Sequence, residues 1–304
     1  MSRKFRFGVS NHGRAPLDWH RFARSAEDLG YSTLVISDHF GMHQIAPLPA
    51  LVAAAGVTSN LRLAAIVLNN DFRHPAVMAK EAATVDVLTG GRFELGLGAG
   101  WETSDYTSSG LVFGAPAERL ARLTETVQIC KALFTGNTVT FHGEHYRIDG
   151  LAGFPTPLQK PHPPIMIGGR QRRLLSFAAR EADIVGVSLV DGQNPRAGMP
   201  PRISQKIEWI KQAAGPRFAD IELQVNAPDI VVTDHPRTAL EEIAARRHSS
   251  VEEALESPAV LVGSVEGIVE RLHALREQYG LSYFVFPARS AESAAGVVAR
   301  ASNC

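Results

Sequence analysis

The sequence has few cysteines, no excess of charge of either sign and no long apolar run. Only two of its 304 residues are cysteines, Cys130 within a helical pattern and Cys304 at the end, which argues against a disulfide framework or a cysteine metal site. Thirty-one basic residues balance thirty-one acidic ones, so no overall field favours nucleic acid or an anionic membrane. No run of about 18 apolar residues could span a bilayer, and the charged start "MSRKFRFGVSNHGR" does not look like a signal peptide. We therefore expect a cytoplasmic protein that recognises its partners locally.

Several catalytic and metal-binding motifs are also missing. The chain contains neither a Walker loop nor a G-x-S-x-G nucleophile elbow, and neither cysteine has an obvious activating partner. The segment "HGEHY" places His142 and His145 three residues apart, but an isolated pair with one nearby glutamate is a weak metal site. We expect both histidines at the surface and predict no metal site.

Apolar strands alternate with amphipathic helices along the chain. Their near-continuous apolar character indicates a parallel sheet covered on both faces, and about eight such strands fit a closed (β/α)8 barrel better than an open sheet. No linker composition divides the chain, so 1–304 is interpreted as one barrel domain. Segments 136–162, with a hairpin around "VTFHGEHYRI", and 188–201 are interpreted as insertions at the C-terminal mouth of the barrel. The expected strands are 5–10, "STLVISDHF", 61–68, "RFELGLGAG", 163–169, "DIVGVSL", "IELQVNAPDIVV" and "LSYFVFP", and helices are expected at about 47–59, 116–134 and 202–214.

The stretch "GGRFELGLGAGW" raises the question of a phosphate-binding loop. Gly96, Gly98 and Gly100 form a G-x-G-x-G string, but a dinucleotide fingerprint needs a third glycine where Trp101 stands, and a helix directly afterwards. The next helix is expected only at Pro116, which is too far away to meet a pyrophosphate. Two interpretations remain: small residues fit a tight barrel corner, or they let a flat ring approach the backbone at the mouth.

Polar residues follow other predicted strands. The second strand ends in "SDHF", where Asp38 can set the tautomer and basicity of His39; alternatively, these are a helix-capping aspartate and a surface histidine. The third strand ends in the polar run "NNDFRHP". The fifth ends in "IGGRQRR", where helix N-terminal amides with Arg170, Arg172 or Arg173 can hold a phosphate; alternatively, this is a plain turn with solvated arginines.

These segments together carry a family resemblance. "SDHF", "RHPAVMAKEAATVDVLTGGRFELGLGAGW", "ERLARLTETVQICKALFTG", "VTFHGEHYRIDG", "PTPLQKPHPPIMIGG" and "LVGSVEGIVERLHALREQYGLSYFVFP" resemble the bacterial-luciferase-like flavin and deazaflavin oxidoreductases. The match runs in order over nearly the whole chain and is most similar to the coenzyme F420-dependent oxidoreductases. The resemblance implies a (β/α)8 barrel with insertions, a homodimer, and a cofactor lying across the C-terminal mouth.

The resemblance also implies roles for individual residues. His39 matches a histidine near the reactive ring carbon that handles a proton, and Asp38 matches an acidic position that touches the cofactor. Ile66–Val67 matches a non-prolyl cis peptide whose bulge supports the ring, and Asn69 matches a contact to the polar edge of the ring. The glycine-rich stretch is thereby expected to make room for the ring. The other cofactor positions implied are the backbone of Ala99 and Gly100, nearby Ser104, and a phosphate loop of Gly168, Gly169, Arg170 and Gln171.

One departure from the family concerns the substrate. The sugar-phosphate dehydrogenase branch has a glutamate where this chain has Trp101, and the lysines of that branch have no clear match. Trp101 therefore favours a flatter or less polar substrate than a sugar phosphate. Trp101 and His43 are the expected substrate contacts, within a shell formed by loops 102–115, 136–162 and 188–201.

These expectations favour a coenzyme F420-dependent oxidoreductase that passes a hydride between the deazaflavin and a small organic substrate. His39, oriented by Asp38, would supply or relay the accompanying proton. Two alternatives stay open. One is an FMN-dependent monooxygenase supplied by a separate reductase, and the other is a non-catalytic cofactor-binding protein.

Overall fold

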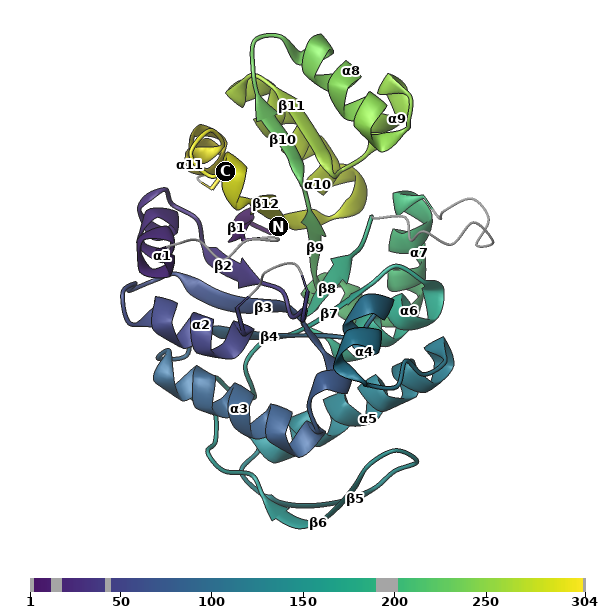
Figure 1. Ribbon diagram of the computed structural model, residues 1–304. Helices are drawn as coiled ribbons and strands as arrows, with labels where there is room; N and C mark the ends of the chain where they lie inside the picture. The colour runs from purple at the N-terminus through teal and green to yellow at the C-terminus, as the bar shows by residue number, and fades with distance from the viewer. Residues whose placement is uncertain (1–2, 12–17, 42–44, 190–201, 303–304) are drawn as a thin grey trace.

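The computed structural model describes residues 3–11, 18–41, 45–189 and 202–302 (Figure 1). At its centre, parallel strands close into a barrel in the order β1-β12-β9-β8-β7-β4-β3-β2, which confirms the predicted (β/α)8 architecture. Strands β2 and β8 are buried along their whole length, because the barrel interior covers one face and the outer helices the other. The barrel strands are β1 Arg6–Ser10, β2 Thr33–Ile36, β3 Arg62–Asn69, β4 Phe93–Gly98, β7 Ile165–Gly169, β8 Ile184–Val187, β9 Glu222–Asn226 and β12 Leu281–Pro287.

The helices begin where the sequence places capping residues. The side chains of Asp18 and Ser264 accept hydrogen bonds from first-turn N–H groups of α1 and α10, and proline opens α2, α3 and α5. The outer helices are α1 Trp19–Asp28, α2 Pro47–Ala55, α3 Pro75–Leu88, α5 Pro116–Phe134, α6 Arg172–Glu181, α7 Ile203–Ala214, α10 Val265–Tyr279 and α11 Ala295–Ala301, with 3-10 turns η1 Asn70–Phe72, η2 Gly215–Asp220 and η3 Ala288–Ser290.

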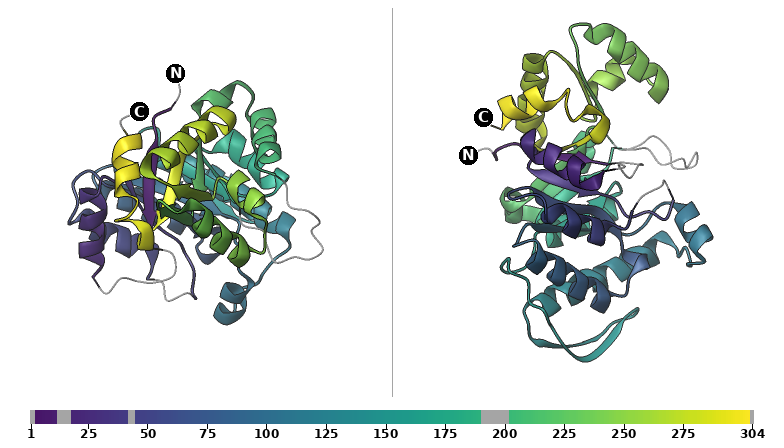
Figure 2. Two further views of the ribbon diagram at one scale, coloured as in Figure 1. Left: turned by 90° about the horizontal axis from the view of Figure 1, so that it is seen from above. Right: turned by 60° about the vertical axis from the view of Figure 1, so that its left-hand side comes forward.

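The predicted single strand "IELQVNAPDIVV" is wrong. It divides into β9 and β10, Asp229–Val232, because Pro228 between them has no N–H group to continue the ladder. Strand β10 leaves the barrel and pairs with β11, Val260–Gly263, in a separate parallel sheet that also carries α8 Pro236–Arg247 and α9 Val251–Glu256. Figure 1 and the right panel of Figure 2 show α8 and α9 at the end of the molecule opposite the β5–β6 hairpin.

That hairpin, β5 Thr138–His142 with β6 Arg147–Ala152, confirms the pairing expected within 136–162, but its expected place at the mouth is wrong. Glu125 of α5 accepts hydrogen bonds from three hairpin N–H groups, including those of Glu144 and Tyr146. Further along, the Gln159 side chain donates to the carbonyl of Phe93, at the start of β4. Because the segment joins the C-terminal end of α5 to the start of β7, it runs along the flank and the N-terminal base of the barrel.

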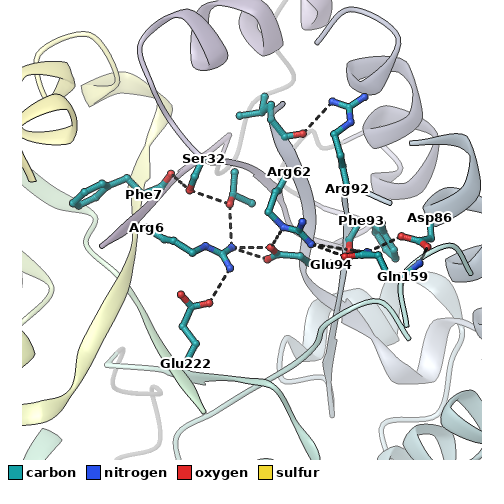
Figure 3. Close-up of polar contacts among 12 residues, drawn as sticks. Arg6, Phe7, Ser32, Arg62, Asp86, Arg92, Phe93, Glu94, Gln159 and Glu222 are labelled. Carbon is teal, nitrogen blue, oxygen red and sulfur yellow. Dashed lines mark hydrogen bonds and ion pairs between the residues drawn. The ribbon is translucent and has the colours of Figure 1, made fainter. Parts of the chain in front are cut away.

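The base is closed by a buried cluster of charges (Figure 3). Arg6 donates to Glu94 at 2.7 Å and to Glu222 at 2.8 Å, and Arg62 also donates to Glu94. Burial raises the pKa of Glu222, although the Arg6 charge opposes this shift. The Arg6 guanidinium lies 4.3 Å from the ring centre of Tyr283, on β12. The ion pairs join the starts of β1, β3, β4 and β9, and the Tyr283 contact adds β12, at the end of the barrel opposite the mouth.

Candidate active site

The C-terminal ends of the strands carry the polar residues expected to form the site. Ser10 ends β1, Asp38 and His39 follow β2, and Asn69 ends β3, on strands that are neighbours in the barrel. The hydroxyl oxygen of Ser10 is buried and has no hydrogen-bond partner among the described residues. Buried polar groups normally have partners, so a polar ligand group at this mouth would satisfy Ser10.

His39 is held by a carboxylate from a different loop. Its Nδ1 lies 2.6 Å from Oδ2 of Asp105, whose side chain is only 3% exposed. Oδ1 of Asp105 accepts the backbone N–H groups of Phe40 at 3.0 Å and Gly41 at 3.3 Å. The expectation that Asp38 orients His39 is therefore wrong. The Asp38 carboxylate is instead occupied by Arg73 and by the backbone N–H of Asn69.

Asp38 instead links neighbouring segments of the barrel mouth through its hydrogen bonds. Its Oδ2 accepts from Nη1 of Arg73 at 2.6 Å and from the backbone N–H of Asn69 at 3.2 Å. Arg73 also lies 3.3 Å from Glu81 of α3. Asp38 thus joins the end of β2 to the end of β3 and to the segment that leads into α3.

Ile66 and Val67 form an apolar floor beneath the mouth. The peptide bond between them is cis, as predicted, and the register of β3 against β4 shifts between Ala65 and Leu68. Both side chains are partly exposed, and a partly exposed apolar surface of this kind fits a flat ring system. Beneath them lie buried residues of the barrel interior, namely Val35, Ala64, Met166, Ile184, Tyr283 and Val285.

Gly96 and Gly98 make room for β3 and not for a ligand. A Cβ atom on Gly96 would lie 2.0 Å from the carbonyl oxygen of Ala65, and one on Gly98 would lie 2.5 Å from Cγ2 of Val67. The expectation that these glycines directly give space to a ring is wrong. Their effect on the site is indirect, because they allow the irregular part of β3 to pack against β4.

A short helix, α4 Thr103–Ser109, follows where no helix was expected before Pro116. Its sequence is polar and has no apolar periodicity, so it depends on its ends. Glu102 caps its N-terminus by accepting from the backbone N–H and the hydroxyl of Ser104, and Gly110 ends it in the left-handed conformation, with φ of 76°. The α4 helix carries Asp105 to the mouth.

The backbone before α4 is fixed by buried groups. Gly100 has φ of 72°, and a Cβ atom there would lie 1.9 Å from the Tyr106 hydroxyl. The carbonyls of Ala99 and Gly100 accept hydrogen bonds from Arg119 of α5. The Tyr106 hydroxyl lies 3.1 Å from Oδ1 of Asn69, and burial raises the pKa of Tyr106 to about 12. The hydroxyl therefore stays protonated and helps to hold the Asn69 amide.

The loop from β7 to α6 leads into a helix N-terminus that has no side-chain cap. Gly168 and Gly169 end β7, Arg170 follows half-buried, and Gln171 precedes α6 without a side-chain capping hydrogen bond. The first N–H groups of a helix point outward, and without a cap they can bind an anionic group. Nearby Arg172 and Arg173 are exposed and add positive charge.

An aromatic ring packs against His39, and other apolar side chains are exposed on the neighbouring loops. The Trp101 ring is 62% exposed, and its centre lies 5.7 Å from that of His39 at an interplanar angle of 80°. Phe40, also exposed, packs against Phe72 with ring centres 4.4 Å apart. In the segment that follows α4, Leu111, Val112 and Phe113 are exposed. The other expected substrate residue, His43, lies outside the described residues, as does most of loop 188–201.

Sequence reasoning missed Asp105, Arg73 and Tyr106. Asp105 and Tyr106 belong to "WETSDYTSSG". In this stretch a capping residue, Glu102, is followed by a terminating glycine, Gly110, at a spacing that indicates a short helix. Arg73 lies within the polar run "NNDFRHP", and nothing local in the sequence indicates that its charge pairs with Asp38.

Two other features of the described residues bear on the chemistry. No group of His, Cys, Asp and Glu among them is arranged to hold a metal ion, and none of their helices is long and apolar enough to cross a membrane. His142 lies on the exposed hairpin, 2.5 Å from Asp149.

Comparison with known proteins places this architecture in a family. The family model for luciferase-like monooxygenases matches residues 4–249. The chain is 34% identical over 199 residues to an F420-dependent glucose-6-phosphate dehydrogenase of Nakamurella multipartita, covering 63% of this chain and 57% of that one. It is 30% identical over 201 residues to an FMNH(2)-dependent dimethylsulfone monooxygenase of Pseudomonas putida, covering 65% of this chain and 52% of that one. The chain thus spans little more than half the length of these relatives.

Among solved structures, the coenzyme F420-dependent tetrahydromethanopterin reductase of Methanopyrus kandleri superposes with a TM-score of 0.77. The match covers 98% of both chains at 18% identity, and it demonstrates the shared fold.

Proposed function

Because the chain belongs to the luciferase-like monooxygenase family, we propose that it is an F420-dependent oxidoreductase that reduces a C=C, C=N or C=O bond of a small organic molecule. The observation that carries this proposal is His39, held by Asp105 at the barrel mouth and placed against Trp101. A histidine in this position can give a proton to the atom next to the one that receives a hydride. The relative from Nakamurella multipartita, which is F420-dependent by name, supports this choice of cofactor.

The mouth offers a fitting surface for the cofactor. Ile66 and Val67 would support the flat ring, the Asn69 amide held by Tyr106 would meet its polar edge, and Ser10 would gain a partner. Bound F420 in its reduced form supplies the hydride. The remaining contacts would come from Asp38, the backbone of Ala99 and Gly100, nearby Ser104 and the phosphate loop of Gly168, Gly169, Arg170 and Gln171.

The charges at the mouth favour an uncharged, flat substrate. Arg73 is paired with Asp38 at 2.6 Å and Arg122 with Asp71 at 2.9 Å, so both cations are already neutralised within the protein. Arg119 donates to backbone carbonyls. The exposed side chains of Trp101 and Phe40 add apolar surface. A sugar phosphate, which needs cationic partners, is a poor match for these groups, and a conjugated carbonyl or imine is a better one.

A reduced-FMN monooxygenase is the second candidate function. The relative from Pseudomonas putida, FMNH(2)-dependent by name, favours it, and a flavin ring would use the same floor. This alternative requires a separate reductase as a partner and inserts oxygen in place of hydrogenating a bond.

The outer surface of α2 and α3 is proposed as a homodimer contact. Val77 and Leu88 of α3 are 48% and 60% exposed, beside an apolar depression of about 890 Å³ that reaches Leu48 and Leu151. Contiguous exposed apolar surface of this kind marks association sites in proteins.

Direct titration of the purified chain with F420 and with FMN tests the choice of cofactor. F420 is expected to bind at least about tenfold more tightly, a difference of about 1.4 kcal/mol. Equal or tighter binding of FMN would favour the monooxygenase.

Catalysis is tested by His39→Ala in single-turnover oxidation of the bound reduced cofactor, with cyclohexenone, an aryl imine and an aryl ketone as probes. The chemical rate is expected to fall about 10²–10⁴-fold with little change in cofactor affinity. His142→Ala, which removes an exposed histidine from a similar aspartate contact, is the matched control and should leave the rate unchanged. A near-native rate in His39→Ala would end the proton-transfer role, and binding of a cofactor without any turnover would favour a non-catalytic binding protein.

A further inference from the structure

The carboxylate that contacts His39 has a fully defined set of partners. Oδ2 of Asp105 faces Nδ1 of His39 at 2.6 Å, and Oδ1 is occupied by the backbone N–H groups of Phe40 and Gly41. Asp105 is 2% exposed, so water does not compete for these contacts. All three partners lie on the segment that follows β2, while Asp105 itself lies on α4.

From these contacts we propose, resting on the function proposed above, that Asp105 is a positioning residue that fixes the His39 ring with its proton on Nδ1, so that Nε2 is the atom that exchanges a proton with the substrate. An ionised carboxylate can only accept hydrogen bonds, so Nδ1 must carry a hydrogen to face Oδ2 at this distance. Nε2 lies on the side of the ring away from Asp105 and is left for chemistry. The same division of the two ring nitrogens recurs wherever a carboxylate orients a catalytic histidine.

The proton balance follows directly. One atom of the substrate double bond would gain a hydride, whose two electrons a bound reduced deazaflavin would supply. The Nε2–H bond of the His39 imidazolium breaks, and that proton bonds to the neighbouring substrate atom. His39 becomes neutral, keeps Nδ1–H on Asp105, and regains a proton at Nε2 from water.

Asp105→Asn tests the assignment sharply, because the geometry dictates how the asparagine must lie. The N–H groups of Phe40 and Gly41 need an acceptor, so the asparagine oxygen takes the place of Oδ1. Its NH2 group then faces Nδ1 of His39 and donates to it, which forces the proton of the neutral ring onto Nε2. The variant is expected to have the opposite tautomer with nearly the same shape.

The first measurement needs no cofactor. The ring nitrogens of 15N-labelled histidine are recorded by NMR in the unliganded chain with the rings neutral, and the His39 signals are identified by their loss in His39→Ala. We expect the Nδ1–H tautomer in the natural chain and the Nε2–H tautomer in Asp105→Asn. An Nε2–H tautomer in the natural chain would overturn the proposal, whether or not the variant folds, and so would an unchanged tautomer in the variant.

The second measurement is single-turnover oxidation of the bound reduced cofactor. Asp105→Asn is expected to slow it about 10²–10⁴-fold while cofactor affinity changes less than about threefold. Asp149→Asn alters the exposed contact to His142 and should change neither the His39 signals nor the rate. A tautomer exchange with an unchanged rate would refute the role of Nε2. If the natural chain shows the Nδ1–H tautomer but turns over no substrate, the proposed function fails and the positioning of His39 by Asp105 stands.

Discussion

Replacing Gly98 by alanine should lower the free energy of unfolding, although the same change usually raises it where space allows. Alanine restricts the unfolded chain relative to glycine, which stabilises a fitting site by about 0.4–1 kcal/mol. At Gly98 the new Cβ atom would lie 2.5 Å from Cγ2 of Val67, far inside ordinary contact distance. Overpacking of this kind costs about 1–3 kcal/mol. The net loss is expected to be about 1–2 kcal/mol, or a fall in Tm of about 2–3 °C for a chain of this length.

Urea unfolding followed by circular dichroism measures this loss, and a second substitution locates its cause. Val67→Ala removes the obstructing methyl groups, so Gly98→Ala added to it should cost nothing, giving a coupling of about 1–2 kcal/mol between the two positions. Gly267→Ala in α10 is the control, because its Cβ atom would lie 3.5 Å from Ser264 Oγ, an ordinary contact. If Gly98→Ala is as stable as this control, or if Val67→Ala brings no relief, then packing against β3 is not the reason for the glycine.

Three further predictions concern other parts of the chain. Glu94→Ala leaves Arg6 and Arg62 without their shared buried partner and should lower the free energy of unfolding by about 3–5 kcal/mol in urea titrations. The folded fraction should still bind cofactor normally. A decrease in the free energy of unfolding of less than about 1 kcal/mol would show that Glu94 contributes little to stability through this cluster. Burial raises the pKa of Cys130 to about 12, so iodoacetamide near neutral pH should label it only after unfolding, as read by peptide mass spectrometry. Labelling of Cys130 in the native chain at the rate of a free thiol would contradict its burial. Leu88→Asp should convert a dimer into a monomer in light scattering, whereas Leu255→Asp, at a 49% exposed position on α9, should not; a persistent dimer would place the interface elsewhere.

The order of the barrel elements was predictable because each one carries its own local signal. The predicted long helix 116–134 matches α5, which begins at a proline and keeps one face apolar through Leu133. The break before β10 was not predictable from hydrophobicity, since apolar residues recur both before Pro228, at Leu223 and Val225, and after it, at Ile230 and Val231. The α4 helix was missed because polar capping groups at its ends stabilise it, and it has no apolar face with helical spacing.

The site was less predictable than the fold for a different reason. His39 could be singled out because it follows an apolar strand, but its partner Asp105 lies 66 residues away in the sequence. The nearest carboxylate in sequence, Asp38, points elsewhere and pairs with Arg73. Likewise, the glycine string is a local signal, but its reason lies in Ala65 and Val67 on the adjacent strand. Contacts between strand ends depend on which strands become neighbours, and no local pattern encodes that.

The charge cluster at the base has a consequence for how the chain is made. Arg6 and Glu222, which pair at 2.8 Å, are 216 residues apart. At about 5–20 residues per second, a ribosome needs about 10–40 s to synthesise the intervening chain. During that interval the first strands can pair with one another, and Arg6 can pair with Glu94 but not yet with Glu222. The barrel cannot close until the later strands are made. Emergence of β9 is therefore the earliest moment in synthesis at which this ion network can be completed.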